Sequence, residues 1–329
     1  MVSAAPLPGR GAECPTVTRA RLRTNVWPMA LSSVALPSRT TVGARLGAYV
    51  ALTKPRIIEL LLITTLPTMI VAQRGLPPVW LMAATLLGGA LAAGGANAIN
   101  MYVDRDIDKL MHRTSKRPLV TGVVSPRNAL VFAIALEIVA FVELWAWVNL
   151  LSAVLAISAT LFYVFVYTLW LKRTSSQNIV IGGAAGAVPV LVGWAAVTDS
   201  LSWTPVVMFA IIFVWTPPHF WALAVKYKDD YRAASVPMLP AVATFKRTSQ
   251  EILVYSAILV AVSLLLAAVA NLGLVYVVSA SVLGLVFIAM AVRLWQRATP
   301  KAAMQLFSYS ITYLTLLFVI MAIDIFTKH

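Results

Sequence analysis

The chain has 329 residues, of which 60% are hydrophobic and only 12% are charged, and its formal net charge is +14. A soluble domain is roughly 45–50% apolar and about 25% charged. The composition therefore excludes a water-soluble globule, a disordered chain and a nucleic-acid-binding domain, and it predicts a protein whose solvent is mostly lipid. The single cysteine, Cys14, excludes an internal disulfide and a cysteine metal cage.

Residues 1–47 differ from the rest of the chain, because they are rich in Pro, Ser, Arg and Ala and hold Glu13 as their only acid. This composition predicts a disordered, basic, cytoplasmic tail. A transit peptide is the alternative, since such peptides are rich in Arg and poor in acids. The tail lacks an apolar stretch long enough for a secretory signal. Residues 48–329 are predicted to form one membrane domain.

Apolar runs long enough to cross a bilayer, roughly 20 residues each, recur along this domain. The longest run, 252–292, divides at a turn signal at 270–273. Pro217 and Pro218 are predicted to break the sixth span. We predict an all-α, polytopic membrane protein with nine transmembrane helices, which begin near residues 57, 78, 128, 149, 178, 204, 252, 273 and 304.

The basic residues indicate the orientation of these helices. If the N-terminus is cytoplasmic, all of the 26 Lys and Arg residues except Arg74 and Lys328 lie on the cytoplasmic side, as the positive-inside rule requires. Tryptophans near the span ends fit an aromatic belt: Trp80, Trp145, Trp147, Trp170 and Trp203.

Three oxygen-bearing side chains, Asn100, Asp104 and Asp108, follow the second predicted span. If the helix continues out of the membrane, their i, i+4, i+8 spacing places them on one stripe, about 6 Å apart along the axis. Like charges at this spacing cost roughly 0.2–0.5 kcal/mol per pair. The stripe therefore indicates a hard cation, and Mg²⁺ bound to carboxylates and substrate phosphates fits it. Asp106 lies off the stripe and faces elsewhere.

Basic residues follow the stripe directly: Lys109, Arg113, Lys116 and Arg117. Acids beside bases suit a magnesium diphosphate, in which the metal bridges carboxylate and phosphate and the bases neutralise the remaining charge. The alternative is a solvated loop whose bases only obey the positive-inside rule. A second acidic pair, Asp229 and Asp230, lies on the same predicted side and is a candidate for a second metal site, with a plain hydrophilic loop as the alternative.

Two motifs identify a family resemblance. Asn-x3-Asp-x3-Asp at 100–108, followed by Arg-Thr-x2-Arg-Pro-Leu at 113–119, resembles the UbiA superfamily of intramembrane aromatic prenyltransferases. Four further stretches are similar to its protohaem IX farnesyltransferase branch, and together the motifs place roughly residues 48–325 in the resemblance. These stretches are 52–56 (LTKPR), 215–221 (WTPPHFW), 226–231 (KYKDDY) and 237–240 (PMLP).

The chain departs from the family pattern at two places. The adjacent Asp229 and Asp230 replace the Asp-x3-Asp found in much of the superfamily, although the adjacent form is similar to the haem branch. Ser235 stands where the family usually has Gly, which predicts a stiffer loop after Asp230.

The resemblance implies a UbiA-type helical bundle with a central cavity open toward the cytoplasmic side. It implies transfer of the farnesyl group of farnesyl diphosphate to the 2-vinyl group of protohaem IX with addition of water, giving haem O and diphosphate. Asn100, Asp104 and Asp108 would bind Mg²⁺-diphosphate, with Asp104 and Asp108 catalytic, and Asp229 and Asp230 would complete the metal site. The candidate diphosphate contacts are Arg113, Arg117, Lys172 and Lys226.

His219 is the only histidine inside a predicted span, and an ionisable group there points to function. It is a candidate haem-iron ligand or a catalytic base for the attacking water, with a neutral, hydrogen-bonded core histidine as the alternative. Lys54 and Arg56 are candidate partners of the haem propionates, unless they only anchor the chain at the membrane surface.

Three other functions fit the sequence less well. A quinone-precursor prenyltransferase on the same fold should have an Asp after Asn100 and no Pro-Pro-His motif, whereas this chain has Met101 and His219. A cation-coupled transporter should hold its charges near the bilayer midplane, and a scaffold for oxidase assembly leaves the acid stripe unexplained.

We expect the protein to lie in a bacterial plasma membrane, with the mitochondrial inner membrane as the weaker alternative. The expected partners are membrane lipid and, as a candidate, haem A synthase, and no nucleic acid.

Overall fold

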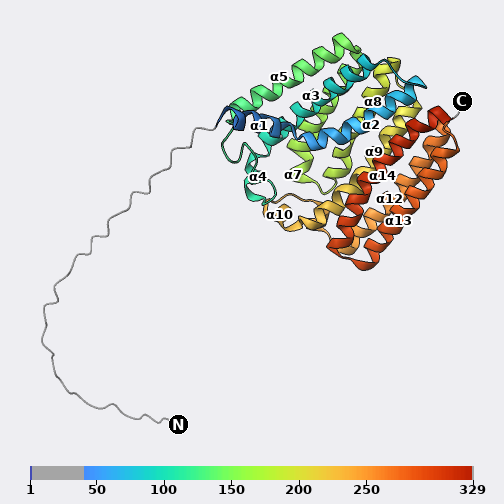
Figure 1. The fold of residues 1–329 in the computed structure, drawn as a ribbon. Coiled ribbons are helices and arrows are strands. Elements are labelled where there is room, and N and C mark those ends of the chain that lie inside the picture. The colour runs from blue at the N-terminus through green and yellow to red at the C-terminus, as the bar shows by residue number, and fades with distance from the viewer. Residues whose placement is uncertain (2–40, 328–329) are drawn as a thin grey trace. The chain divides into compact units, whose positions relative to one another are not determined.

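A computed structural model describes Met1 and residues 41–327, and this part of the chain forms helices and no strand (Figure 1). The elements are α1 Val42–Thr53, α2 Pro55–Gln73, α3 Val79–Val103, α4 Arg105–Leu110, α5 Pro126–Trp147, α6 Leu150–Leu161, the π-helix η1 Phe162–Leu171, α7 Lys172–Thr174, α8 Asn178–Thr198, α9 Trp203–Lys226, α10 Lys228–Ala233, α11 Leu239–Val242, α12 Phe245–Val269, α13 Leu274–Arg297 and α14 Pro300–Thr327. The predicted all-α membrane architecture is confirmed.

Eight helices within the described residues are long and apolar enough to cross a membrane. The predicted first span, α2, has 19 residues, and its apolar part is the shorter stretch Leu62–Gln73. The count of nine therefore stays a prediction, as does the central cavity open toward the cytoplasm. Most of the predicted tail lies outside the described residues, but its last part does not, because α1 begins at Val42.

The predicted break at Pro217 and Pro218 is wrong, since α9 runs unbroken from Trp203 to Lys226. Each proline lacks the N–H that would bond one turn back, so contacts with α14 compensate. The Trp215 indole N–H donates to the Ser310 carbonyl at 2.8 Å, and His219 Nδ1 lies 2.7 Å from the Ser310 hydroxyl. These contacts flank the two prolines and hold the helix against its neighbour.

The predicted turn between α12 and α13 is confirmed, and capping contacts gather at that end of the bundle. Arg74 donates to the Ala270 carbonyl at 2.7 Å, where α12 ends. The buried Asp324 of α14 accepts from the backbone N–H groups of Gly273 and Tyr276, where α13 begins. A carboxylate is favourable at a helix N-terminus because it satisfies free N–H groups and the helix dipole. The helix ends at this side of the bundle are therefore capped by side chains of other helices.

Helices α3 and α5 pack closely through small residues. A Cβ added at Gly95 of α3 would lie 2.5 Å from Glu137 Oε1 of α5, so a larger residue there would force the Glu137 side chain to shift. Glu137 is buried and accepts a hydrogen bond from the Thr160 hydroxyl at 3.2 Å. Thr160 is thus a partner of this intramembrane acid that the sequence did not identify. The five tryptophans of the predicted belt are all exposed on the surface of the bundle.

Candidate active site

The acid stripe lies where α3 passes into α4. The backbone N–H of Asp104 donates to the Asn100 carbonyl, and that of Asp108 donates to the Asp104 carbonyl, both at 2.9 Å. Helical hydrogen bonding therefore continues across the junction and lines the three side chains up, as their spacing predicted. All three are buried, with exposed fractions of 3% for Asn100, 0% for Asp104 and 2% for Asp108.

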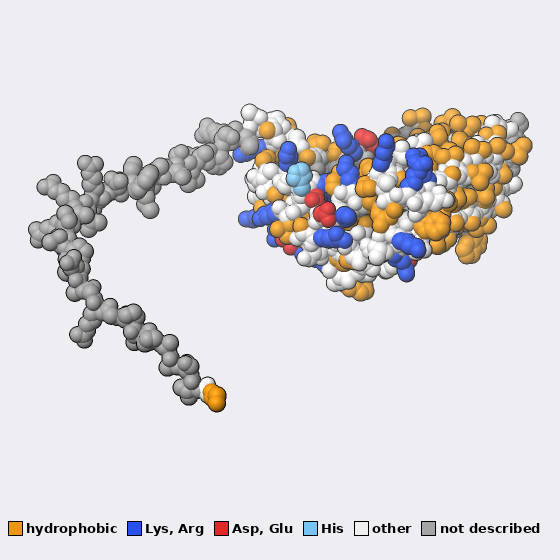
Figure 2. Space-filling view, turned by 90° about the horizontal axis from the view of Figure 1, so that it is seen from below, with side chains coloured by type: hydrophobic (Ala, Val, Ile, Leu, Met, Phe, Trp, Pro, Cys, Tyr) orange, Lys and Arg blue, Asp and Glu red, His pale blue; other side chains and the backbone are white. Residues whose placement is uncertain are grey.

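Each member of the stripe meets a basic side chain from a different segment. Arg117 Nη1 lies 2.6 Å from Asp108 Oδ2, and Lys172 Nζ pairs with Asp104 Oδ2. Lys54 Nζ donates to Asn100 Oδ1 at 2.9 Å. Buried carboxylates are costly unless they are paired, so these cations are what allows two acids to be buried side by side. Figure 2 shows Lys and Arg side chains gathered with a few acidic side chains on one face of the bundle.

The pKa of Lys54, which lies between α1 and α2, is lowered to about 7. Burial is the main cause, and the nearby positive charges of Arg117 and Lys172 add to it. Lys54 was predicted as a haem-propionate partner together with Arg56. The structure places its ammonium on the acid stripe, beside the diphosphate candidates, while Arg56 is exposed.

The amide of Asn100 is held in one orientation. Its Nδ2 donates to Asp104 Oδ2 at 2.8 Å and to the Thr168 hydroxyl at 3.2 Å, which leaves Oδ1 to face Lys54. The Thr168 hydroxyl in turn donates to the Tyr163 carbonyl five residues earlier, at 2.8 Å, inside the π-helix. Short π-helical stretches occur frequently at functional sites. Here the π-helix positions a hydroxyl that orients a candidate metal ligand.

These donors fit a magnesium ion. Asp104 Oδ1 is buried and has no hydrogen-bond partner. Its ion-pair partner, Arg173 Nη2, lies 3.9 Å away. A buried carboxylate oxygen without a partner is costly, and a hard cation satisfies it. Within the described residues no group of three His, Cys, Asp or Glu side chains is arranged to hold a metal. The protein therefore offers two carboxylates and an amide oxygen, a set that suits Mg²⁺ carrying substrate phosphates.

The second acidic pair divides between two environments. Asp230 Oδ2 accepts a hydrogen bond from the backbone N–H of Arg113 at 3.1 Å, which ties α10 to the loop after the acid stripe. The Asp229 side chain is 81% exposed, and its ion pair with Arg232 has an N–O distance of 3.5 Å. The structure brings Asp230, and not Asp229, to the first acidic region.

The remaining diphosphate candidates gather around one ring. The guanidinium carbon of Arg113 lies 5.5 Å from the centroid of the Tyr227 ring, and Lys226 Nζ lies 5.4 Å from it. A cation over an aromatic face is stabilised by the ring quadrupole. Arg113, from the loop after the acid stripe, and Lys226, at the end of α9, therefore meet at Tyr227 next to α10, whereas Arg117 and Lys172 contact the stripe itself. A small apolar core that includes Ile107 and Tyr231 joins the two loops.

Asp106 points away from the stripe, as predicted, and pairs with Arg173. The two N–O distances are 2.7 and 2.8 Å, and this bidentate contact lowers the pKa of Asp106 to about 2. Arg173 and Thr168 are the two residues of this region that the sequence analysis missed. Arg173 was interpreted only as a marker of membrane orientation. Thr168 lies in an uncharged apolar run that gives no local signal.

His219 lies on α9, away from any contact with the stripe that the structure records. Its ring stacks on Trp215 at 4.2 Å and on Phe307 at 4.6 Å between centroids, and its Nδ1 bonds to Ser310. These contacts describe a hydrogen-bonded histidine in an aromatic enclosure. Its role as an iron ligand or a base stays a prediction.

The comparison with known proteins settles the family. A family model described as the UbiA prenyltransferase family matches residues 61–319. The chain belongs to this family. A protoheme IX farnesyltransferase of Parafrankia sp. is 57% identical over 87% of this chain and 91% of its own length. One from Renibacterium salmoninarum is 53% identical over 88% of this chain and 93% of its own length.

Solved structures agree on the family fold. A digeranylgeranylglyceryl phosphate synthase superposes with a TM-score of 0.72 at 16% identity, covering 86% of this chain and 99% of that one. A UbiA homolog from Archaeoglobus fulgidus bound to GPP and Mg²⁺ gives a TM-score of 0.57 at 17% identity, covering 83% and 99%. At these identities the likeness concerns the fold.

Proposed function

We propose that this prenyltransferase transfers the farnesyl group of farnesyl diphosphate to the 2-vinyl group of protohaem IX. The allylic carbon–oxygen bond breaks, a carbon–carbon bond to the vinyl group forms, water supplies a hydroxyl group, and diphosphate and haem O are released. The observation that carries the diphosphate half is the buried stripe, in which the two acids and Asn100 are each held by a base. The acceptor is supported by the names of the relatives at 53% and 57% identity.

The residues of the stripe would prepare the leaving group. Asn100, Asp104 and Asp108 would hold Mg²⁺, which neutralises charge on the departing diphosphate when bound. Arg117, Lys172 and Lys54 face these residues. With the acids holding the metal, these bases would be available to the phosphate oxygens, where they would oppose the charge that develops as the bond breaks. The UbiA homolog bound to GPP and Mg²⁺ supports this use of a divalent metal.

The residues around α10 would complete the diphosphate site. Asp230 is anchored to the Arg113 backbone, and Arg113 and Lys226 share the Tyr227 ring. We assign Arg113 and Lys226 to the outer phosphate. Asp229 and Asp230 remain the candidates for a second metal, with Asp230 the better placed of the two.

The haem would enter from the bilayer, with its propionates near the basic face and Arg56 as the exposed propionate partner. His219 remains the candidate iron ligand or base. We place the protein in a bacterial plasma membrane with the N-terminus cytoplasmic, because the bases gather at the end of the bundle that carries the site. Transfer of the product to a haem A synthase stays a prediction.

The reaction can be tested with the purified full-length chain, farnesyl diphosphate, Mg²⁺ and either protohaem IX or 4-hydroxybenzoate as acceptor. Mass spectrometry should find haem O with protohaem and no prenylated 4-hydroxybenzoate. Prenylation of the phenol alone would replace this proposal with a quinone-precursor prenyltransferase. A protein that binds farnesyl diphosphate but forms neither product would contradict the proposed acceptor.

A further inference from the structure

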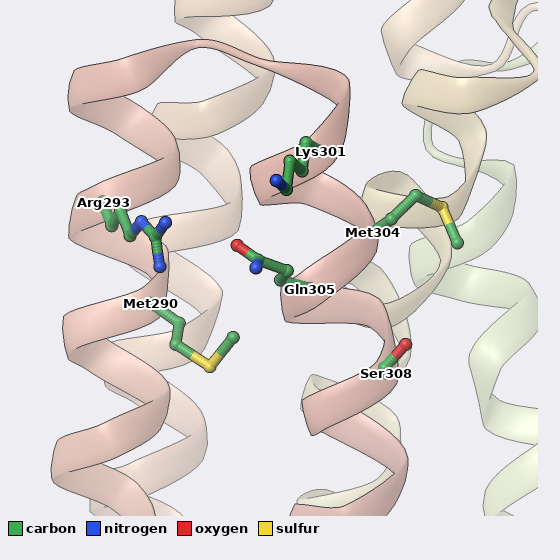
Figure 3. A pocket seen from close by; sticks show the side chains of 6 residues that line it. All are labelled: Met290, Arg293, Lys301, Met304, Gln305 and Ser308. Atoms are coloured by element: carbon green, nitrogen blue, oxygen red, sulfur yellow. The ribbon is translucent and has the colours of Figure 1, made fainter.

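A second polar feature lies outside the proposed active site, in a groove between α13 and α14. The groove has a volume of about 560 Å³ and is lined by Met290, Arg293, Lys301, Met304, Gln305 and Ser308. Figure 3 shows that Arg293 of α13 and Lys301 and Gln305 of α14 point into the space between the two helices. Nothing in the proposed farnesyl transfer uses these residues.

The groove lies at the charged end of the bundle, near the level of a membrane surface. Helix α13 begins at the opposite end, where Asp324 caps Gly273, so it ends at the charged end with Arg297. Helix α14 starts three residues later, at Pro300. Arg293 therefore sits about one turn before the end of α13 and Lys301 at the start of α14, near the level where headgroups and hydrocarbon meet.

The two cations of the groove have no acidic partner. None of the ion pairs within the described part of the chain involves Arg293 or Lys301, and both side chains are exposed. On the acid stripe, by contrast, the bases Arg117 and Lys172 are paired with carboxylates. A groove with two unpaired cations, an amide and a hydroxyl selects an anion that also accepts and donates hydrogen bonds.

An apolar track leads out of the groove toward the hydrocarbon core. Below Met290, the α13 residues Val286, Val282 and Val278 follow at i−4 spacing and are 41%, 55% and 52% exposed. Residues at this spacing form one face of a helix. An anion bound between Arg293 and Lys301 therefore lies directly above an exposed apolar strip, and an acyl chain fits that strip.

We propose that this groove is a binding site for the headgroup of an anionic phospholipid. Arg293 and Lys301 bind the phosphate, Gln305 and Ser308 hydrogen-bond to the polar headgroup, and one acyl chain lies along the valine strip. Basic pockets between membrane helices on the cytoplasmic side are suited to such headgroups. The same helix, α14, also carries Phe307 and Ser310, which contact His219.

Native mass spectrometry of the full-length chain in an uncharged detergent tests the proposal. The chain is titrated with phosphatidylglycerol or with phosphatidylcholine of the same acyl chains. The wild type should retain phosphatidylglycerol preferentially. The double variant Arg293→Gln with Lys301→Gln should bind it roughly 10- to 30-fold more weakly, because each base near a lipid surface contributes on the order of a factor of several.

Two matched control variants test whether the loss of binding is specific to the groove. Arg127→Gln with Lys246→Gln removes two exposed bases from the same end of the bundle and should change phosphatidylglycerol binding less than twofold. Arg293→Lys with Lys301→Arg keeps both charges and should retain binding. Equal retention of the two lipids by the wild type, or an equal loss in the control double variant, would overturn the proposal. Full competition by millimolar inorganic phosphate would also overturn it, because a free-anion site needs no acyl chain.

Discussion

The two acidic regions at the charged end of the bundle differ in how tightly the protein holds them. Asp104 and Asp108 are buried on a continuous helical line, and each is paired with a base from another segment. Asp229 and Asp230 lie on α10, where one side chain is 81% exposed and the other is held by a single backbone N–H. The first region is preorganised, whereas the second lies on a short helix tied by one side chain to the loop after the stripe.

This difference predicts that the two regions make unequal contributions to catalysis. A preorganised charge costs no rearrangement when the diphosphate develops its negative charge, and such groups dominate electrostatic catalysis. An exposed carboxylate is screened by water and exchanges one set of partners for another at little cost. Substitutions that remove the charge but keep the shape can measure this inequality.

The largest effect is expected for Asp104→Asn and Asp108→Asn. Each removes one buried carboxylate from the metal site and leaves its base, Lys172 or Arg117, without its partner. We expect kcat to fall by about 10²–10³ for either change. Steady-state farnesyl transfer measures this, and a variant with more than one tenth of the wild-type rate would contradict the metal-diphosphate assignment.

A smaller effect is expected for Thr168→Val, which keeps the side-chain shape and removes the hydroxyl that orients Asn100. Outer-shell partners of this kind typically affect metal affinity by about 10–100-fold. The Mg²⁺ concentration for half-maximal rate should rise by that factor, while kcat at saturating Mg²⁺ should change little. Thr168→Ser keeps the hydroxyl and serves as the control. An unchanged Mg²⁺ requirement in Thr168→Val would show that the hydroxyl only stabilises the π-helix.

Within the second region, the matched pair Asp230→Asn and Asp229→Asn separates the docked side chain from the exposed one. Asp230→Asn weakens the hydrogen bond to the Arg113 backbone, and a loss of about 1 kcal/mol corresponds to roughly fivefold in kcat/KM. Asp229→Asn should stay within about twofold, because its ion pair is exposed. If Asp229→Asn proves as damaging as Asp104→Asn, Asp229 must move into the site when substrate binds.

The smallest effect is expected for the ion pair between Asp106 and Arg173, which lies outside the stripe. Both side chains are substantially exposed, at 59% and 35%, so Asp106→Asn should reduce the free energy of unfolding by no more than about 1 kcal/mol. The folded-state pKa of Asp106 is about 2, below its ordinary value of 3.8. Its contribution is therefore fully present above pH 3.8 and is lost as the pH falls toward 2. Melting temperatures of wild type and variant should converge on acidification.

Much of this arrangement follows from the sequence, because it depends on local pattern. The lengths of the apolar runs predicted the eight longest helices, and the spacing of Asn100, Asp104 and Asp108 predicted their common stripe. The prediction of a break at Pro217 and Pro218 failed because contacts with α14 override the local cost of proline. Thr168 could not be identified, because its role depends on a π-helical turn and on a partner 68 residues away in sequence.

The different environments of Asp229 and Asp230 could likewise not be predicted from the sequence. Adjacent residues on a short helix face different ways, and only the fold decides which one meets Arg113. Lys54 shows the same limit. Its position before α2 fits an anchor at the membrane surface, but the left-handed backbone conformation at this residue, with a φ of 54°, joins α1 to α2. The ammonium group of Lys54 bonds to Asn100 at the stripe.

The most direct test of the central claim is the binding of a non-hydrolysable farnesyl thiolodiphosphate, measured by titration calorimetry with and without Mg²⁺. The wild type and Asp229→Asn should bind it with similar affinity and only when Mg²⁺ is present. Asp108→Asn should lose at least tenfold in affinity. Mg²⁺-dependent binding of equal strength in the wild type and Asp108→Asn would contradict the claim that the buried stripe holds the metal and the diphosphate.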